Sequence, residues 1–275
     1  MRSENTDQKK LESEISQKIK ELLPDHLLLL RRSLRRLFLT TYDFFRLDIK
    51  RALKLYYWYF SLLFKYIRNQ KAPEYQIELY PCLNDNLGYT PVDPIYFFQN
   101  AWAARHIFNF KPKYILDIGS PVAFLGIISQ FVKVFFVDIR PPTIKVKGLE
   151  YVKGDMLSLP FRDNSVDFIS SLCVIEHIGL GRYGDKIDPD GSEKAIKQIK
   201  RILRPLGIAL ISVHIDQRNK VYFNAHRAFS MEYLRSIIDG FKIIDQKFLY
   251  GEDLYETYIR EKGFGTVYLC LQKMV

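Results

Sequence analysis

The stretch Tyr114-Ile115-Leu116-Asp117-Ile118-Gly119-Ser120 is typical of a buried strand that ends in an acid, a glycine and a hydroxyl group. Three similar signals follow along the chain: Val134-Phe135-Phe136-Val137-Asp138, Gly154-Asp155-Met156, and Val166-Asp167-Phe168-Ile169-Ser170-Ser171-Leu172. Short apolar runs separated by helical segments predict an open α/β sheet of mostly parallel strands. Ligands of such sheets bind at the carboxyl ends of the strands, where the acids of the first three signals would lie.

Hydrophobic periodicity extends this pattern to both sides. After the first strand, further strands are predicted at residues 132–137, 149–152, 166–172, 208–213, 241–250 and 266–272. Helices are predicted at residues 96–110, 122–131, 192–203 and 230–238, with Ser192 as the N-cap of the third. The alternation of helices and strands predicts one doubly wound α/β domain over residues 96–275.

Positive charge is concentrated in the N-terminal part. Residues 1–71 hold 16 Lys and Arg against 8 Asp and Glu, whereas the rest of the chain holds 25 against 23. Apolar residues recur at helical spacing within residues 27–68, so we predict a basic amphipathic helical extension over residues 1–72 and a proline-rich linker over 73–95. This extension would pack on the catalytic domain or on a second copy of the chain, or contact a membrane interface peripherally through residues 27–68. Nucleic-acid binding is the least favoured role.

The cysteines and the apolar runs exclude several classes of protein. The three cysteines (Cys82, Cys173 and Cys270) form neither a metal-like cluster nor a disulfide scaffold. The longest apolar run, residues 56–64, is far shorter than the roughly 20 residues that span a bilayer. The polar N-terminal residues are unlike a signal peptide. We therefore expect a cytoplasmic protein, with peripheral contact on the inner membrane face as a further option.

The four strand-end signals resemble those of class I S-adenosylmethionine-dependent methyltransferases. The resemblance implies a Rossmann-like sheet of seven strands, mostly parallel with one antiparallel, and S-adenosylmethionine as the cofactor. It implies a cofactor site made of Asp117, Gly119, Ser120, Asp138, Asp155, Met156 and Glu176. A carboxylate suits the ribose diol because it offers two acceptor oxygens, so Asp138 is placed there; Asp155 would accept from the adenine amine beside the apolar wall of Met156.

The loop after the first strand departs from that family. Its members have a glycine-rich loop there, whereas in this chain no glycine follows Gly119 until Gly126. A dinucleotide-binding domain is an alternative, but the chain has no G-x-G-x-x-G motif, which argues against NAD. A methyltransferase-like scaffold that no longer binds the cofactor is the other alternative.

Two further motifs carry a more specific resemblance. They are Glu176-His177-Ile178-Gly179-Leu180-Gly181-Arg182-Tyr183-Gly184-Asp185 and Phe223-Asn224-Ala225-His226-Arg227. Over roughly residues 95–235 the chain resembles a little-characterised methyltransferase-like family known as a domain of unknown function. Its members often occur among genes for bacterial surface polysaccharides, which implies an acceptor of that class.

These motifs also supply the candidate catalytic and substrate-binding residues. A high-pKa oxygen nucleophile needs a general base, and His177 is the first candidate and His226 the second because histidine titrates near neutral pH. A structural histidine in the loop is the alternative for His177, and Glu176 would bind the cofactor or orient that histidine. Candidate substrate-binding residues are Arg182, Tyr183, Asp185, Asn224 and Arg227, with salt bridges inside the loop as the alternative for Arg182, Tyr183 and Arg227.

No metal is predicted from the sequence. Asp185, Asp188 and Asp190 offer the hard oxygen ligands that divalent cations prefer, but Asp-Pro-Asp-Gly is more simply a turn. The leading functional hypothesis is O-methylation of a sugar, polysaccharide or glycolipid intermediate at the cytoplasmic membrane face. RNA methylation is disfavoured because the catalytic part is nearly neutral and lacks an Asn-Pro-Pro-Tyr-like motif after the fourth strand. A non-catalytic scaffold is the third hypothesis. The oligomeric state stays open.

Overall fold

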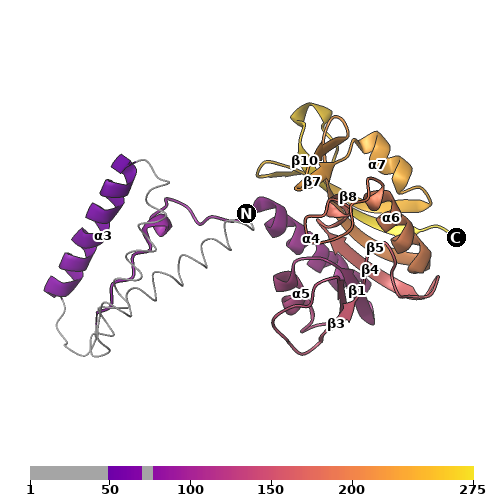
Figure 1. Cartoon of the computed structure of the whole chain (residues 1–275), viewed down its shortest axis with the longest axis horizontal. Coiled ribbons are helices and arrows are strands. Elements are labelled where there is room, and N and C mark those ends of the chain that lie inside the picture. The colour runs from indigo at the N-terminus through magenta and orange to yellow at the C-terminus, as the bar shows by residue number, and fades with distance from the viewer. Residues whose placement is uncertain (1–48, 70–76) are drawn as a thin grey trace. The chain divides into compact units, whose positions relative to one another are not determined.

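The computed structural model describes residues 49–69 and 77–275 of the chain. The chain divides into two compact units, Met1–Pro91 and Val92–Val275 (Figure 1). The predicted boundaries at residues 72 and 95 stay predictions, and the predicted helical segments before residue 49 lie outside the described residues.

The described part of the first unit contains helix α3, Ile49–Asn69, and a short 3-10 helix, Leu83–Asp85. Helix α3 confirms the helical periodicity predicted for these residues. Its large exposed apolar side chains are Leu53, Tyr57, Phe60, Leu62, Phe64, Tyr66 and Ile67. Within the described ranges, no helix is long and apolar enough to cross a membrane.

The second unit is built on an eight-stranded sheet in the order β3-β2-β1-β4-β5-β10-β8-β9 (Figure 1). The strands are β1 Tyr114–Ile118, β2 Lys133–Asp138, β3 Leu149–Lys153, β4 Val166–Leu172, β5 Leu203–Ile215, β8 Phe241–Tyr250, β9 Asp253–Tyr255 and β10 Gly265–Lys273. Strands β1 to β5 are parallel, and β10 runs antiparallel between β5 and β8. The Rossmann-like methyltransferase fold class is confirmed, with two corrections. The short edge strand β9 raises the count from seven to eight, and because it pairs antiparallel with β8 it is a second antiparallel strand in addition to β10.

Helices cover both faces of this sheet, because successive strand residues point to opposite sides. Helices α4 (Pro94–Phe110) and α5 (Val122–Ile128) bury their apolar residues in a core with Ile115, Val134 and Leu210. Helices α6 (Gly191–Ile202) and α7 (Met231–Ile237) bury theirs in a second core that includes Leu116 and Ile211. The alternation of β1 and β5 residues between the two cores places these helix pairs on opposite faces.

Several element ends differ from the prediction for identifiable reasons. Helix α4 begins at Pro94 because Asp93 accepts hydrogen bonds from the backbone N–H groups of Ile95 and Tyr96. Ser192 is not the N-cap of α6, which is Asp190; the Ser192 hydroxyl instead donates to the Ile175 carbonyl oxygen at 2.8 Å.

Strand β5, Leu203–Ile215, extends beyond the predicted residues 208–213 at both ends, and Pro205 and Gly207 lie inside it. The pairing register between β4 and β5 shifts between Val166 and Phe168, and Leu206 has a φ of 64°. An irregularity of this kind absorbs proline and glycine without ending the strand. Two strands were also missed, β6 Lys220–Tyr222 and β7 His226–Ala228, which pair with each other in a separate small sheet.

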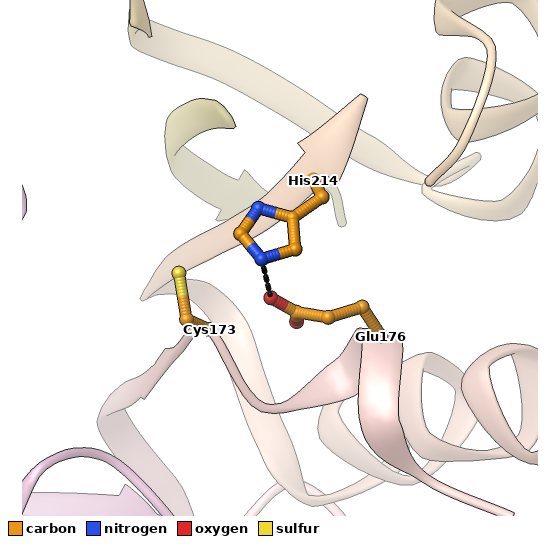
Figure 2. A group of neighbouring side chains, drawn as sticks. All are labelled: Cys173, Glu176 and His214. Atoms are coloured by element: carbon orange, nitrogen blue, oxygen red, sulfur yellow. Dashed lines mark ion pairs between the residues drawn. The ribbon is translucent and has the colours of Figure 1, made fainter. Parts of the chain in front are cut away.

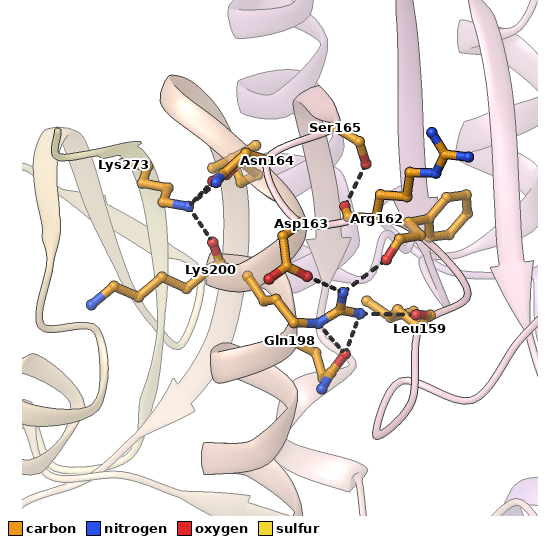
Figure 3. Close-up of polar contacts among 11 residues, drawn as sticks. Leu159, Arg162, Asp163, Asn164, Ser165, Gln198, Lys200 and Lys273 are labelled. Atoms are coloured by element: carbon orange, nitrogen blue, oxygen red, sulfur yellow. Dashed lines mark hydrogen bonds and ion pairs between the residues drawn. The ribbon is translucent and has the colours of Figure 1, made fainter.

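Two half-buried cationic side chains, Arg201 and Lys273, hold the loop between β3 and β4 against α6 and β10 (Figure 3). Arg201 of α6 donates to the carbonyl oxygens of Leu159 at 2.9 Å and Phe161 at 2.8 Å, and pairs with Asp163 at 2.7 Å. Lys273 of β10 donates to the Asn164 side chain at 2.7 Å. The loop that begins with the third strand-end signal is therefore fixed to the sheet and to α6.

Candidate functional site

A cavity lies at the carboxyl ends of β1 and β2 and beside the loop that follows β3. Its volume is about 100 Å³. We call it the first cavity; its lining includes Ile118, Gly119, Val137, Asp138, Ile139, Arg140, Gly154, Asp155, Met156, Leu157, Cys173, Val174, His177, Ile178, Tyr183, Asp185 and Lys186. The sequence placed the ligand at this edge of the sheet, and the cavity is found there.

Asp117 directly precedes the lining residues Ile118 and Gly119, but it does not itself line the first cavity. Its carboxylate is fully buried and accepts hydrogen bonds from the Ser120 backbone N–H at 3.0 Å and from the Ser170 hydroxyl at 2.5 Å. Burial raises the pKa of Asp117 to about 6. This residue therefore shapes the turn after β1, and direct contact with a cofactor, as expected from the sequence, does not fit its position.

The turn after β1 requires glycine at position 119. Gly119 has a φ of 74°, and a Cβ atom added there would lie 2.8 Å from Val174 Cγ1. Its N–H donates to the Val137 carbonyl oxygen at 3.0 Å, which ties the turn to β2. Ser120 follows with its hydroxyl accepting from the Leu172 backbone N–H at 3.0 Å, and it lines the adjoining second cavity. Gly119 lines the first cavity, whereas Ser120, which was predicted to belong to the cofactor site, lines only the second.

Asp138 ends β2 with its carboxylate in the cavity wall. It accepts hydrogen bonds from the Arg140 backbone N–H at 2.7 Å and from the Arg140 Nε at 3.3 Å. The Arg140 guanidinium also lies 4.3 Å from the centroid of the Tyr183 ring, a cation–π distance. Arg140 was not recognised in the sequence, although it lies two residues after the second strand-end acid.

Asp155 and Met156 follow β3 on the other side of the first cavity. Asp155 is exposed and accepts from the Leu157 backbone N–H at 2.8 Å through Oδ1. The Met156 side chain is buried and forms part of the apolar wall. Their arrangement agrees with the predicted pair of one polar acceptor and one apolar surface.

The Glu-His pair after β4 lies on a short 3-10 helix, Ile175–His177. Glu176 is fully buried and does not line either cavity, so the predicted contact between Glu176 and a cofactor does not fit its position. Burial raises the pKa of Glu176 to about 8.

His177 lines both cavities, and its Nδ1 lies 2.6 Å from the Ala225 carbonyl oxygen. A carbonyl oxygen only accepts hydrogen bonds, so Nδ1 carries the proton and Nε2 keeps its lone pair. Burial lowers the pKa of His177 to about 4, and the ring is neutral near pH 7. His177 is thus a neutral hydrogen-bond acceptor at the junction of the two cavities.

The second cavity adjoins the first, because the two share the lining residues Gly119, Asp138, Arg140, Cys173, His177 and Tyr183. Its further lining includes Asp93, Tyr96 and Asn100 from the start of α4, and Arg182, His214 and His226. The rings of His214 and His226 lie 4.6 Å apart, and Phe264 packs against both. The two predicted histidines, His177 and His226, therefore both line this cavity, with ring centroids 6.3 Å apart.

Arg182 and Tyr183 also lie in the wall of the second cavity. The Arg182 guanidinium donates to the Ala225 carbonyl oxygen at 3.0 Å, and the Tyr183 ring lies edge-on to His177 at 5.7 Å. Two of the residues predicted to bind the substrate thus line this cavity, and their role in binding stays a prediction.

Of the other three predicted substrate residues, Asp185 and Arg227 hold the loops together and Asn224 lies in an exposed turn. Asp185 lines the first cavity, but its carboxylate accepts the backbone N–H groups of Gly179 and Gly181 at 2.8 and 3.2 Å. Arg227 is buried and donates to the carbonyl oxygens of Ile178, Asp188 and Pro189 and to the Ser192 hydroxyl. Asn224 is exposed in the β6–β7 turn with a φ of 62°, outside the lining of both cavities.

Cys173 and His214 line the second cavity but were not predicted as site residues. Cys173 has a φ of 52°, a left-handed conformation that is uncommon outside glycine and that recurs at functional sites. His214 ends the apolar run of β5, where a lone histidine gave no periodic signal. A weak signal for Cys173 was available, because it follows β4 directly at the ligand-binding edge of the sheet.

Part of this chain is similar to an uncharacterised family and to an uncharacterised archaeal protein. The model of a family described as "Caenorhabditis protein of unknown function, DUF268" matches residues 158–257, a range that contains both long motifs. An uncharacterized protein of Methanocaldococcus jannaschii is 25% identical over 166 residues, which are 59% of this chain and 68% of that protein.

Two characterised proteins are also similar in part. The tRNA (carboxymethyluridine(34)-5-O)-methyltransferase of Arabidopsis thaliana is 32% identical over 84 residues, which are 29% of this chain and 19% of that protein. The structure of 1,6-didemethyltoxoflavin-N1-methyltransferase from Burkholderia thailandensis, solved with S-adenosylhomocysteine, is 18% identical with a TM-score of 0.46. That likeness covers 64% of this chain and 79% of the other.

Proposed function

We propose that the chain is an S-adenosylmethionine-dependent methyltransferase that binds its cofactor in the first cavity. One observation carries this proposal: Gly119, Asp138 and Asp155 follow three neighbouring parallel strands and line one cavity at their carboxyl ends. A ligand with a ribose diol and a purine fits these groups in this order, because each acid offers acceptor oxygens to donors of the nucleoside.

The residues of the first cavity fit such a cofactor. The missing Cβ of Gly119 leaves room for close approach of a ligand to the backbone. Asp138 would accept hydrogen bonds from the two ribose hydroxyls, with Arg140 keeping its carboxylate in place. Asp155 would accept from the exocyclic amine through Oδ2, since Oδ1 is already bonded to the Leu157 N–H. Met156 supplies a polarizable apolar surface for the purine.

The second cavity is the proposed acceptor site, and His177 is the proposed positioning and proton-accepting group. S-adenosylmethionine supplies an electrophilic methyl group on a sulfonium centre. His177 keeps its Nε2 lone pair because Nδ1 is bonded to Ala225, so it would accept the hydrogen bond of an acceptor hydroxyl and orient its oxygen. His226 lines the same cavity and is the second proton acceptor.

A sugar hydroxyl of a polysaccharide or glycolipid intermediate is the proposed acceptor. Arg182, Tyr183 and Tyr96 give the second cavity hydrogen-bonding groups and aromatic faces, which suit a hydroxyl-rich ring. The exposed aromatic and aliphatic side chains of α3 support peripheral contact with the cytoplasmic face of the inner membrane, where such intermediates would be reached.

RNA methylation is the second candidate. The similarity to the Arabidopsis tRNA methyltransferase over 84 residues favours it. The charge distribution opposes it: residues 72–275 hold 25 Lys and Arg against 23 Asp and Glu, whereas RNA binding relies on phosphate neutralisation by a basic surface.

Methyl transfer from labelled S-adenosylmethionine separates these candidates. The purified chain would be incubated with cell-envelope glycolipid extract or with total tRNA, with Asp138→Ala as the matched inactive control. Label in the glycolipid fraction that is absent in the control supports the proposal, and label in nuclease-sensitive material supports RNA methylation. Label in neither fraction, from protein that binds S-adenosylhomocysteine, would rule out both acceptors; no binding of that compound would favour the non-catalytic scaffold.

A further inference from the structure

Cys173, Glu176 and His214 bring one sulfur, one carboxylate and one imidazole nitrogen together beside the second cavity (Figure 2). They come from the end of β4, from the 3-10 helix that follows it and from the end of β5. One ligand atom of each lies within 4.8 Å of the others, and His214 Nε2 lies 3.6 Å from Glu176 Oε1.

The Glu176 carboxylate is the unexplained member of this group. It is fully buried, and among the described residues neither of its oxygens has a hydrogen-bond partner. The Cys173 thiol donates instead to Gln99 Oε1 at 3.0 Å. Buried carboxylates are ordinarily paired or bound to a metal, because their desolvation is costly.

The contact between Glu176 and His214 is long, because the 3.6 Å between His214 Nε2 and Glu176 Oε1 exceeds the length of a hydrogen bond. This contact therefore leaves both oxygens of Glu176 without a hydrogen bond among the described residues.

His214 is held in an orientation that suits a ligand. Its Nδ1 lies 3.1 Å from the Thr266 hydroxyl. With the Nδ1 proton donated to Thr266, the Nε2 lone pair faces Glu176. Metal-binding histidines commonly have such a second hydrogen bond, which fixes the tautomer and the ring direction.

We propose that Cys173, Glu176 and His214 bind a divalent transition-metal ion of the Zn²⁺ class. Thiolate, imidazole and carboxylate are the ligand types of Zn²⁺ sites, with metal–ligand distances of about 2.0–2.3 Å. A tetrahedral ion with such distances separates its nitrogen and oxygen ligands by about 3.4 Å, close to the observed 3.6 Å. One thiolate and one carboxylate also cancel the ion's double charge, so that the occupied site is neutral in its buried surroundings.

Hydrogen bonds to Ser212 and Gln99 hold Cys173 in place as a metal ligand. Its N–H donates to the Ser212 carbonyl oxygen at 3.0 Å and to the Ser212 hydroxyl at 2.9 Å, which keeps the left-handed conformation. Gln99 is fully buried and its Nε2 has no partner among the described residues. A half-turn of this amide would direct Nε2 to the Cys173 thiolate as a donor.

The fourth coordination position would face the second cavity, since Cys173 and His214 both line it. Three protein ligands with one open position are typical of catalytic Zn²⁺ sites. If the proposed methyl transfer holds, on which this step alone rests, an acceptor hydroxyl would occupy that position. The bound hydroxyl would lose its proton to a cavity histidine, and its oxygen would form the C–O bond as the sulfonium C–S bond breaks.

The test is titration of chelator-treated, tag-free full-length protein with Co²⁺, followed by displacement with Zn²⁺. We expect one equivalent of Co²⁺ to bind with a thiolate-to-cobalt charge-transfer band and the visible bands of a four-coordinate ion. Cys173→Ser should abolish the charge-transfer band, and Glu176→Gln should weaken binding roughly 100-fold or more. Cys82→Ser and Cys270→Ser are matched thiol controls and should retain both band and affinity.

Circular dichroism verifies that each variant is folded before titration. Absence of Co²⁺ binding by the wild type, a complex without the thiolate band, or an unchanged band in folded Cys173→Ser would each overturn the proposal. Binding of S-adenosylhomocysteine to the same metal-free wild type is measured in parallel. Loss of Co²⁺ binding alone would contradict the metal site, and loss of S-adenosylhomocysteine binding alone would contradict the proposed function. The two failures are therefore distinguished.

Discussion

His177 Nδ1 lies 2.6 Å from the carbonyl oxygen of Ala225, which joins the loop after β4 to the β6–β7 turn. Arg182 Nη1 donates to the same oxygen at 3.0 Å. The two long sequence motifs therefore meet at one backbone carbonyl, although about 40 residues separate them in the chain. This bond fixes the His177 tautomer and leaves Nε2 as the acceptor at the junction of the two cavities.

Replacing His177 tests its role in the proposed chemistry. We expect His177→Ala to lower the rate of methyl transfer by about 10² to 10⁴-fold, the usual contribution of a positioned proton acceptor, while S-adenosylhomocysteine still binds. His106→Gln is the control, because His106 pairs with Asp245 at 2.9 Å and lines neither cavity. Turnover that survives in His177→Ala would remove His177 as the proton acceptor.

Gly119 is predicted to be required for cofactor binding both for its backbone conformation and for the space that a Cβ atom would fill. Gly119→Ala combines a φ of 74° with a Cβ atom 2.8 Å from Val174 Cγ1, and should weaken S-adenosylhomocysteine binding by about tenfold or more. Gly251→Ala shares the positive φ, at 62°, but its Cβ meets no atom within 4 Å. It should lose about 1 kcal/mol of stability and keep its affinity. Equal affinities in the two variants would contradict this account of the turn.

The buried Asp117 carboxylate should make stability depend on pH between about pH 4 and 6. Burial raises its pKa from 3.8 to about 6, so in this range the folded state binds more protons than the unfolded state. The contribution of Asp117 to stability therefore falls as pH rises, by roughly 3 kcal/mol across the range. Asp117→Asn has no titrating group at this position. Urea unfolding should therefore show that its free energy of unfolding rises relative to that of the wild type from pH 4 to pH 6.5. If the stability of the two proteins depends on pH in the same way, or if Asp117→Asn becomes relatively more stable at low pH, the pKa of Asp117 is not raised.

Arg201 should contribute more to the free energy of unfolding than the exposed Arg204. Its guanidinium donates to two backbone carbonyls and pairs with Asp163, so we expect Arg201→Ala to lose about 2–3 kcal/mol in urea unfolding. Arg204→Ala breaks a pair with Asp167 whose partners are 52% and 59% exposed, and should lose less than about 1 kcal/mol. A loss of the same size in both variants would mean that Arg201 does not anchor the loop.

Much of the fold was predictable because buried parallel strands are short, apolar and nearly continuous. Strands β1, β2 and β4 lie within a residue or so of their predicted bounds. The start of β5 was missed because Pro205 and Gly207 are turn residues, whereas the chain keeps pairing through an irregular register. Sequence patterns report turn propensity, and the pairing that overrides it depends on the neighbouring strand.

The candidate site was predictable where a residue's role follows from its place at the end of a strand. Asp138 and Met156 line the first cavity for that reason. Arg227 was predicted to bind the substrate, but it donates to backbone carbonyl oxygens. Every residue has such a carbonyl, so the sequence does not indicate which ones an arginine will contact. The group of Cys173 with His214 is formed by the pairing of β4 with β5, which places Leu172 opposite Ser212. Contacts of this kind exist only once the sheet is formed.

The most direct test of the central claim is isothermal titration of the full-length chain with S-adenosylhomocysteine, with Asp138→Ala as the test variant and Asp167→Ala as the control acid. We expect micromolar binding by the wild type and by Asp167→Ala, and a loss of at least tenfold in Asp138→Ala, because Asp138 lines the first cavity and Asp167 does not. No binding by the folded wild type, or unchanged affinity in Asp138→Ala, would contradict the proposed cofactor site.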